Sequence, residues 1–192
     1  MGEPLACVAH SVRLSRFRAG DRVAFIGAGY MGRLHLALTR HGGSAGVGMV
    51  DVSHARLADA SAAGATWVAT PEDAAAVGGQ QDVVFVTAGA PGSFELGLSL
   101  CDDGGTLVVY GAFPKELMVP LSPDTVHHRE LSVIGVYSQE PEDWRTSAGL
   151  IRSGALTGDL DRLVTAHFPL SEVAEALHLV STSPAYRVLV GR

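Results

Sequence analysis

The fold is decided by residues 23–32, which read Val-Ala-Phe-Ile-Gly-Ala-Gly-Tyr-Met-Gly. Four apolar residues run straight into a turn that holds three glycines in a Gly-x-Gly-x-x-Gly spacing. An apolar stripe then continues over Leu34–Leu38 at the spacing of a helix face. This order predicts a strand, a tight turn and a helix, which is the first unit of an α/β protein.

Each glycine of this turn has its own mechanical task. Gly27 allows the chain to turn sharply off the strand, and Gly29 leaves room for a pyrophosphate against the backbone. Gly32 lets the helix lie close to the sheet, so that its free N–H groups and positive dipole end face the phosphates. The turn, including Tyr30 and Met31, therefore predicts a dinucleotide-binding site.

An acidic residue at the end of the next strand supports this prediction. The apolar run 45–50 ends in Asp51, which stands nineteen residues after Gly32. A carboxylate at that point accepts hydrogen bonds from the ribose hydroxyls and repels a 2′-phosphate, so NAD is favoured over NADP. The alternative interpretation is a cluster of loop glycines followed by a surface aspartate.

Composition limits the classes of function. The 192 residues fit one domain, or one domain with an appendage, and 47% of them are hydrophobic. The net charge of −6 argues against nucleic acid as a partner. Two cysteines without a CxxC pair suit a reducing compartment, and the sequence has no apolar run of membrane-spanning length. We therefore expect a cytoplasmic protein that does not bind membranes.

The pattern of strands and helices predicts a Rossmann fold. Near-continuous apolar strands alternate with helices, which is typical of a parallel sheet covered on both faces. We expect a doubly wound six-stranded sheet in the order 3-2-1-4-5-6. Its strands are expected at 22–27, 45–50, 66–69, 82–87, 105–110 and 131–137, and its helices at 4–16, 30–41, 53–63, from 71, and 93–101.

From about residue 140 the pattern changes. A helix through Arg152 and a turn over 154–158 precede a strand, a helix and a strand, expected at 163–168, 171–180 and 186–190. These last elements have no place in the six-stranded sheet, so we divide the chain into a nucleotide-binding domain, 1–162, and an appendage, 163–192. The apolar strand 186–190 is expected to be paired with another segment.

Several ordered motifs resemble the zinc-type medium-chain dehydrogenases, most closely the sorbitol, threonine and cyclitol dehydrogenases. The motifs are Glu3-Pro-Leu-Ala-Cys, the glycine turn, Arg56-Leu, Gly104-Gly-Thr-Leu-Val, His127-His-Arg-Glu-Leu-Ser-Val-Ile-Gly and Phe168-Pro-Leu-Ser-Glu-Val-Ala-Glu-Ala. The resemblance covers almost the whole chain but only the C-terminal half of a family member. It implies that the GroES-like domain, which carries the catalytic zinc, lies outside this sequence.

The resemblance also assigns candidate site residues. In the family a Cys and a His of the GroES-like domain hold the zinc, and of the surrounding residues only Glu3 can be carried over. We therefore expect no zinc in this chain alone, and a separate GroES-like zinc chain as one partner. For the cofactor, the resemblance adds Arg56 beside the adenine and three loops near the nicotinamide, at Ala88 and Gly89, Gly111 and Ala112, and Tyr137. Ordinary turns explain these loops nearly as well.

Three functions remain open from the sequence. The first is the NAD(H)-binding module of a dehydrogenase, transferring hydride between NAD and a secondary alcohol such as a polyol, a cyclitol or an amino alcohol. The second is a non-catalytic NAD(H)-binding or regulatory protein, and the third is a shortened family member with zinc-independent chemistry. In the family, the edge strand that matches Leu131–Tyr137 pairs across a two-fold axis, so the resemblance also implies a homodimer.

Overall fold

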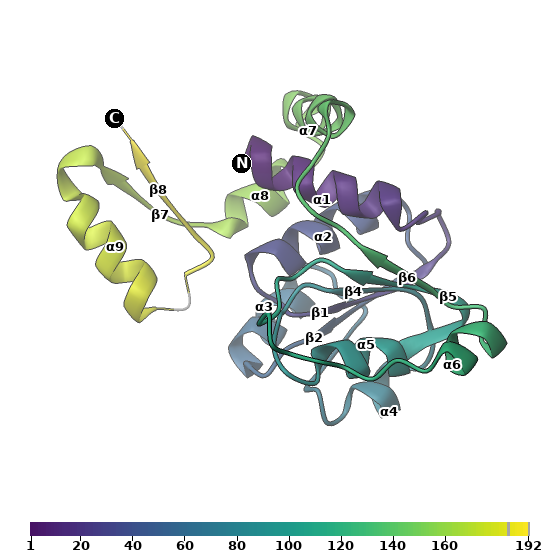
Figure 1. Ribbon diagram of the computed structural model, residues 1–192. Helices are drawn as coiled ribbons and strands as arrows, with labels where there is room; N and C mark the ends of the chain where they lie inside the picture. The colour runs from purple at the N-terminus through teal and green to yellow at the C-terminus, as the bar shows by residue number, and fades with distance from the viewer. Residues whose placement is uncertain (184, 192) are drawn as a thin grey trace.

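The computed structural model describes residues 1–183 and 185–191. Its centre is a six-stranded, fully parallel sheet with the order β3-β2-β1-β4-β5-β6, which confirms the predicted Rossmann topology (Figure 1). The strands are β1 Arg22–Ile26, β2 Gly46–Val50, β3 Trp67–Ala69, β4 Gln81–Val86, β5 Cys101–Val109 and β6 Ser132–Gly135.

Helices cover both faces of this sheet, because alternate residues of each strand point to opposite sides. On one face, α2 and α3 pack with Phe25, Met49 and Phe85. On the other face, α4 and α5 pack with Ile26 and Val84. The helices of the sheet are α2 Tyr30–His41, α3 His54–Ala62, α4 Ala74–Gly78, α5 Ser93–Leu100 and the short α6 Pro123–His128.

A second layer of helices lies on α2. Helix α1 (Gly2–Leu14) and helix α8 (Thr157–Leu163) bury Leu5, Leu160 and Leu163 against Leu34 and other residues of α2. Helix α7 (Pro141–Ser153) packs on α1 on the side away from the sheet (Figure 1). The longest helices have 13 residues, so within the described ranges no helix is long and apolar enough to cross a membrane.

The C-terminal elements form a separate strand–helix–strand unit, as expected. Strand β7 (Val164–Pro169) pairs in parallel with β8 (Arg187–Gly191), and α9 (Val173–Thr182) connects them after the 3-10 turn η1 (Leu170–Glu172). Figure 1 shows this unit beside the main sheet, joined to it through α8. The expected partner for the last strand is thus β7.

Some element boundaries differ from the expectations. Helices α6 and α8 were not predicted, and Cys101 begins β5 instead of ending the preceding helix. The edge strand is shorter than the expected Leu131–Tyr137, since β6 ends at Gly135. Strand β5 begins at Cys101 because Cys101 pairs with Gln81, ahead of an irregularity in the ladder between Gln81 and Val83. The polar Asp-Asp-Gly-Gly sequence that follows Cys101 does not indicate a strand.

His35 is a fully buried histidine at the junction of α1, α2 and the sheet. Its ring packs against Phe25, Phe85 and Tyr110, with Tyr110 in an edge-on contact at 4.7 Å between ring centres. Its Nδ1 lies 2.8 Å from the Met31 carbonyl oxygen and its Nε2 faces the Ser11 hydroxyl, so the neutral Nδ1–H tautomer satisfies both contacts. Burial lowers the pKa of His35 to about 4.

We therefore expect acid to destabilise the protein through His35. The unfolded chain binds a proton near pH 6.5 and the folded chain only near pH 4, so stability is complete above pH 6.5 and falls as the pH drops towards 4. The loss amounts to about 3 kcal/mol. Chemical denaturation at several pH values across this range measures the loss. The His128→Gln variant, which removes an exposed histidine, is the control and should show the same loss. An unfolding free energy that stays level from pH 6.5 to 4 would contradict the assignment.

Gly32 brings α2 into direct contact with the first turn of the sheet. A Cβ atom added at Gly32 would lie 1.9 Å from the Gly27 carbonyl oxygen, so the helix could not keep its place with any side chain there. Gly149 in α7 is the opposite case, because a Cβ there meets nothing within 4 Å. The two helical glycines differ only in what surrounds them.

The Gly32→Ala and Gly149→Ala variants should therefore change stability in opposite directions. Alanine at Gly149 gains helix propensity and should stabilise the protein by about 0.5–1 kcal/mol. Alanine at Gly32 forces α2 away from the sheet and should destabilise it by about 1–3 kcal/mol. Denaturant titration of both variants measures the difference, and a Gly32→Ala variant as stable as the parent would disprove the contact.

Candidate functional site

The glycine turn joins the carboxyl end of β1 to the amino end of α2. The Gly27 N–H donates to the Val50 carbonyl at 2.7 Å, which ties the turn to the end of β2. Gly27 adopts a φ of +112°, and a Cβ there would lie 2.7 Å from Thr87 Oγ1, so both conformation and space require glycine. Gly29 precedes α2 as its N-cap, which leaves the first N–H groups of the helix pointing out of the turn.

Asp51 lies beside this turn at the end of β2. Its Oδ2 accepts the Ala28 backbone N–H at 2.8 Å, and its Oδ1 accepts the Ser53 backbone N–H at 2.9 Å. The Ser53 side chain in turn caps α3 by accepting the N–H of Arg56. The carboxylate is therefore held in a fixed position between the glycine turn and the start of α3.

A cavity of about 520 Å³ opens at these strand ends. It brings together four of the predicted cofactor residues: Gly27, Asp51, Arg56 and Ala88. Its other lining residues are mostly apolar or small and come from the ends of β1 and β2, the loops after β2, β3 and β4, and the start of α5: Ile26, Val50, Val52, Pro71, Glu72, Ala90, Pro91, Gly92, Ser93 and Leu96. An elongated ligand with an apolar ring at one end and an anionic group at the glycine turn suits this lining.

The predicted loops after β4 and β5 touch each other next to this cavity. A Cβ at Gly89 would lie 1.7 Å from the Ala112 carbonyl oxygen, and one at Gly111 would lie 2.9 Å from the Thr87 carbonyl oxygen. Both glycines are therefore required for the two loops to approach. Tyr137 lies beyond the end of β6 and is 94% exposed.

Glu3 is an exposed residue of α1 and lies beside the loop that follows β6. The Cys7 sulfur lies 3.2 Å from Glu3 Oε1 and 2.9 Å from Gln139 Oε1. Burial and the neighbouring Glu3 carboxylate raise the pKa of Cys7 to about 12, so the thiol stays protonated and donates a hydrogen bond. This group holds one carboxylate and a neutral thiol, which is not a set of ligands for zinc.

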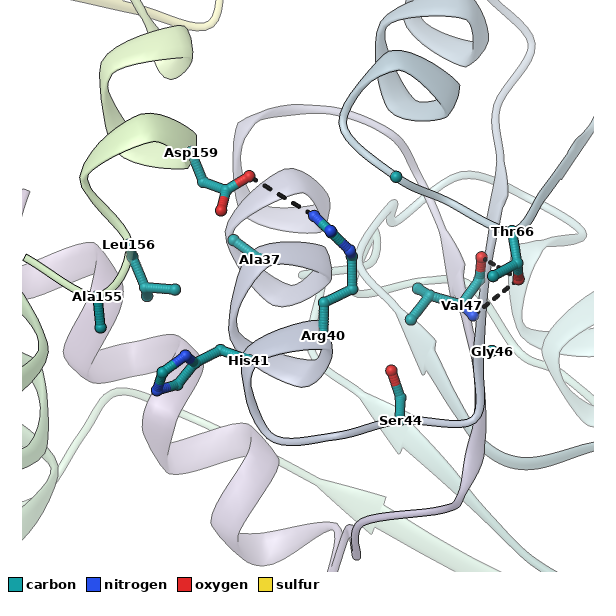
Figure 2. Close-up of a pocket in the computed structure, with 11 residues that line it drawn as sticks. Ala37, Arg40, His41, Ser44, Gly46, Val47, Thr66, Ala155, Leu156 and Asp159 are labelled. Atoms are coloured by element: carbon teal, nitrogen blue, oxygen red, sulfur yellow. Dashed lines mark hydrogen bonds and ion pairs between the residues drawn. The ribbon is translucent and has the colours of Figure 1, made fainter.

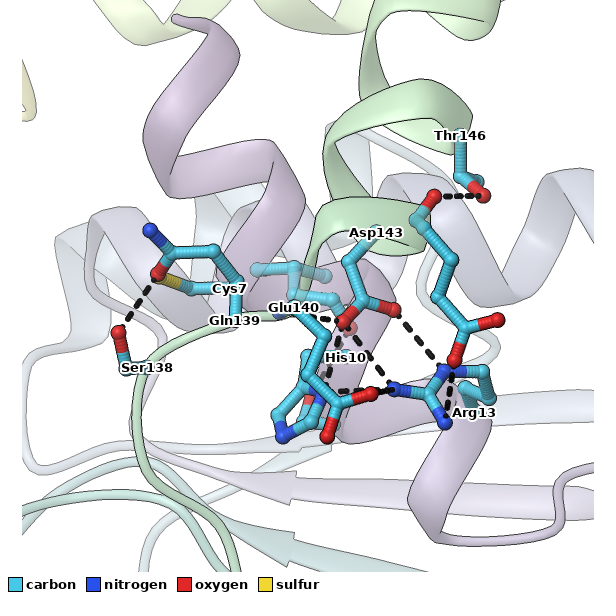
Figure 3. A network of polar contacts seen from close by, with 11 residues as sticks. Cys7, His10, Arg13, Ser138, Gln139, Glu140, Asp143 and Thr146 are labelled. Atoms are coloured by element: carbon cyan, nitrogen blue, oxygen red, sulfur yellow. Dashed lines mark hydrogen bonds and ion pairs between the residues drawn. The ribbon is translucent and has the colours of Figure 1, made fainter.

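One trio of potential metal ligands does occur, and an arginine lies within it. The ligand atoms of His10, Glu140 and Asp143 lie within 4.8 Å of one another where α1 meets α7. Figure 3 shows Arg13 among them, with its Nε 3.0 Å from Asp143 and its Nη2 3.1 Å from Glu140. Burial would raise the pKa of Asp143, but hydrogen bonds from Arg13, the Glu140 N–H and His10 keep it below its usual range. The guanidinium already balances these carboxylates, so the trio serves to join two helices.

Another cavity, of about 340 Å³, lies at the opposite end of the sheet. Figure 2 shows Arg40 between Asp159 of α8 and the start of β2, with Thr66 bonded to Val47. Arg40 donates to the Ala63 carbonyl at 2.6 Å, so its guanidinium caps the carboxyl end of α3. This cavity is remote from the glycine turn and holds none of the predicted site residues.

Two arginines near the glycine turn escaped the sequence analysis. The Arg187 guanidinium of β8 lies 4.9 Å from the ring centre of Tyr30, the first residue of α2. Arg33, one turn into α2, lies 5.5 Å from the ring centre of Tyr186. No spacing in the sequence could have indicated these pairs, because each joins segments more than 150 residues apart.

Comparisons with known proteins agree with this geometry. The sequence model described as zinc-binding dehydrogenase matches residues 18–153. A sorbitol dehydrogenase of Rattus norvegicus is 29% identical over 98% of this chain and 54% of its own length. A D-arabitol-phosphate dehydrogenase of Enterococcus avium is 30% identical over 99% of this chain and 56% of its own length.

Solved structures give the same assignment. A protein of Sinorhizobium meliloti 1021, described as a zinc-binding dehydrogenase bound to NADP, superposes with a TM-score of 0.89 at 30% identity. It is matched over 100% of this chain and 58% of its own. The chain thus spans about half the length of the relatives it matches. The glycine turn, the sheet order and these matches together place the chain in the zinc-binding dehydrogenase family of the medium-chain type.

Proposed function

We propose that this chain is the NAD(H)-binding module of a medium-chain alcohol dehydrogenase that acts on a secondary alcohol, such as a polyol. The observation that carries the proposal is the fixed Asp51 carboxylate beside the glycine turn, at the edge of a cavity of about 520 Å³. A bound nicotinamide supplies the chemistry of the module, which is to accept or donate a hydride.

The residues of the site fit the parts of a dinucleotide. The first N–H groups of α2 and the Arg187 guanidinium suit the pyrophosphate, since both present positive charge at the same helix end. Asp51 suits the ribose hydroxyls of the adenosine, and Val52 and Arg56 suit the adenine. The loops at Gly89 and Gly111 lie on the side of the turn that remains for the nicotinamide ribose.

The cofactor is proposed to be NAD in preference to NADP. Both Asp51 oxygens already accept backbone N–H groups, so the carboxylate is held in place beside the glycine turn. A 2′-phosphate at the same position would meet this negative charge. The Sinorhizobium meliloti relative was solved with NADP, so the affinities of this chain for NADH and NADPH should be measured side by side.

Catalysis with zinc is proposed to need a GroES-like zinc domain in addition to these residues. Glu3 offers one carboxylate, and the His10, Glu140 and Asp143 trio is balanced by Arg13, so the described residues do not fit a catalytic zinc. The appendage from residue 163 would contact that domain. Its helix α9 and the turn before it expose Leu170, Val173, Leu177 and Val180, between 44% and 70% of each side chain.

The proposal is tested by titrating the purified chain with NADH in a calorimeter, together with metal analysis of the same sample. Changing Asp51 to Ala should weaken NADH binding by about 1–3 kcal/mol, because hydrogen bonds to a charged group are lost. The same change should reduce the difference in affinity between NADH and NADPH. The Asp161→Ala variant, which removes an exposed carboxylate, is the control and should bind NADH as the parent chain does.

Four results would separate the alternatives. No heat of NADH binding would refute the module, and equal affinity in the Asp51→Ala variant would show that the ribose is held elsewhere. NADH binding without oxidation of test alcohols, even after a zinc-loaded GroES-like domain is added, would favour a non-catalytic NAD(H)-binding protein. Turnover of a non-alcohol substrate without zinc would favour new chemistry.

The module is also proposed to be a homodimer joined through β6. This strand ends the sheet after β5, and Val133 is 37% exposed there. Pairing two such edges would give a continuous sheet across a two-fold axis.

Light scattering at micromolar concentration should accordingly give about 40 kDa, twice the 20.0 kDa of one chain. A Val133→Asp variant should give the monomer mass, because it would place a carboxylate on the edge strand that pairing would bury. Val77→Asp, on exposed α4, is the matched control and should leave the mass unchanged. A monomeric parent protein would exclude this interface.

A further inference from the structure

The appendage contacts the glycine-turn helix through two crossed arginine–tyrosine pairs. Arg187 of β8 lies over the Tyr30 ring, and Arg33 of α2 lies over the Tyr186 ring, at 4.9 and 5.5 Å from the ring centres. Tyr30 and Arg33 are one helical turn apart, so they lie on the same side of α2. Tyr186 and Arg187 are neighbours in the chain, so one short segment makes both contacts.

The Tyr186 hydroxyl also joins two charges on the main domain. It lies 3.4 Å from Arg33 Nη1, which donates to it, and 3.2 Å from Asp59 Oδ2, which accepts from it. Arg33 is only 6% exposed, and a guanidinium that far from solvent needs a negative charge nearby. The Tyr186 hydroxyl lies between this guanidinium and the Asp59 carboxylate of α3. Burial raises the pKa of Tyr186, which keeps the bridging proton in place.

This bridge fixes the one point of β8 that matters for the proposed site. The Arg187 side chain is exposed, and among the described residues its contact with the main domain is the ring of Tyr30. The neighbouring Tyr186 is held by two hydrogen bonds of its hydroxyl to the main domain and by its own N–H, which donates to Thr165 Oγ1. A long arginine side chain loses much entropy when it is held over a helix end. A fixed backbone directly before it reduces that cost.

We propose that Tyr186, Arg33 and Asp59 are positioning residues, which hold Arg187 above the first turn of α2 so that it faces the phosphates of a bound dinucleotide. The proposal rests on the function proposed above and adds a part for the appendage. Because coupling between two sites is reciprocal, a bound pyrophosphate would also hold the appendage more firmly on α2.

The test compares a ligand with phosphates and one without. Tyr186→Phe keeps the ring under Arg33 and removes only the bridging hydroxyl. It should raise the Kd for NADH about three- to tenfold, the effect of one or two lost hydrogen bonds. The Kd for adenosine, followed by chemical-shift titration, should change by less than about twofold, since adenosine has no phosphate for Arg187 to meet.

A double-mutant cycle then shows whether the hydroxyl acts through Arg187. If it does, Tyr186→Phe should add nothing to the effect of Arg187→Leu on NADH binding. Asp59→Asn tests the same bridge from α3, should one variant fail to fold. Ser181→Ala is the control, because it removes a hydroxyl of the appendage that bonds only within α9.

The outcomes are distinguishable from those for the function itself. If the parent chain binds NADH but Tyr186→Phe binds it equally well, the positioning role is wrong and the module stands. Equal losses for NADH and adenosine, or fully additive effects in the cycle, would also overturn it, since they indicate a general loss of structure. A parent chain that binds no NADH would overturn both proposals.

Discussion

The contact between Gly32 and the Gly27 carbonyl determines the rest of the structure. Since no side chain separates them, α2 lies directly on the end of β1, and its N-terminus points out at the carboxyl edge of the sheet. The same closeness places His35 against Phe25 and Phe85 and gives α1 and α8 a surface on which to pack. Core packing and the candidate phosphate site thus depend on one van der Waals approach.

Asp51 links that geometry to the proposed chemistry. Its carboxylate fastens the glycine turn to the start of α3 through Ala28 and Ser53, so the acid has a structural task before any ligand binds. A group that is held on both oxygens needs little reorganisation when a ribose approaches. The turn and the acid therefore act as one preformed unit at the end of β1 and β2.

The fold could be predicted because its signals are local. Continuous apolar strands and the glycine turn specify the parallel sheet over short stretches of sequence. The strand order follows from the Rossmann fingerprint, which is the glycine turn together with Asp51. Helix α8 was missed because Gly158 lies inside its seven residues and its burial depends on α2. Arg33, Tyr186 and Arg187 were missed for a related reason: their contacts arise only when α2 and β8 meet in space.

The appendage is only partly covered by the other described residues. Two parallel strands with one crossover helix leave backbone edges and apolar side chains without cover, whereas parallel strands are normally covered on both faces. The unit nevertheless contacts α2 next to the proposed phosphate site, because the Tyr186 hydroxyl accepts a hydrogen bond from Arg33 and donates one to Asp59 of α3. One side of the appendage thus suits the nucleotide and the other suits a further domain. A contact with both sides would let cofactor binding and the docking of that domain influence each other, because the same strand–helix–strand unit carries both surfaces.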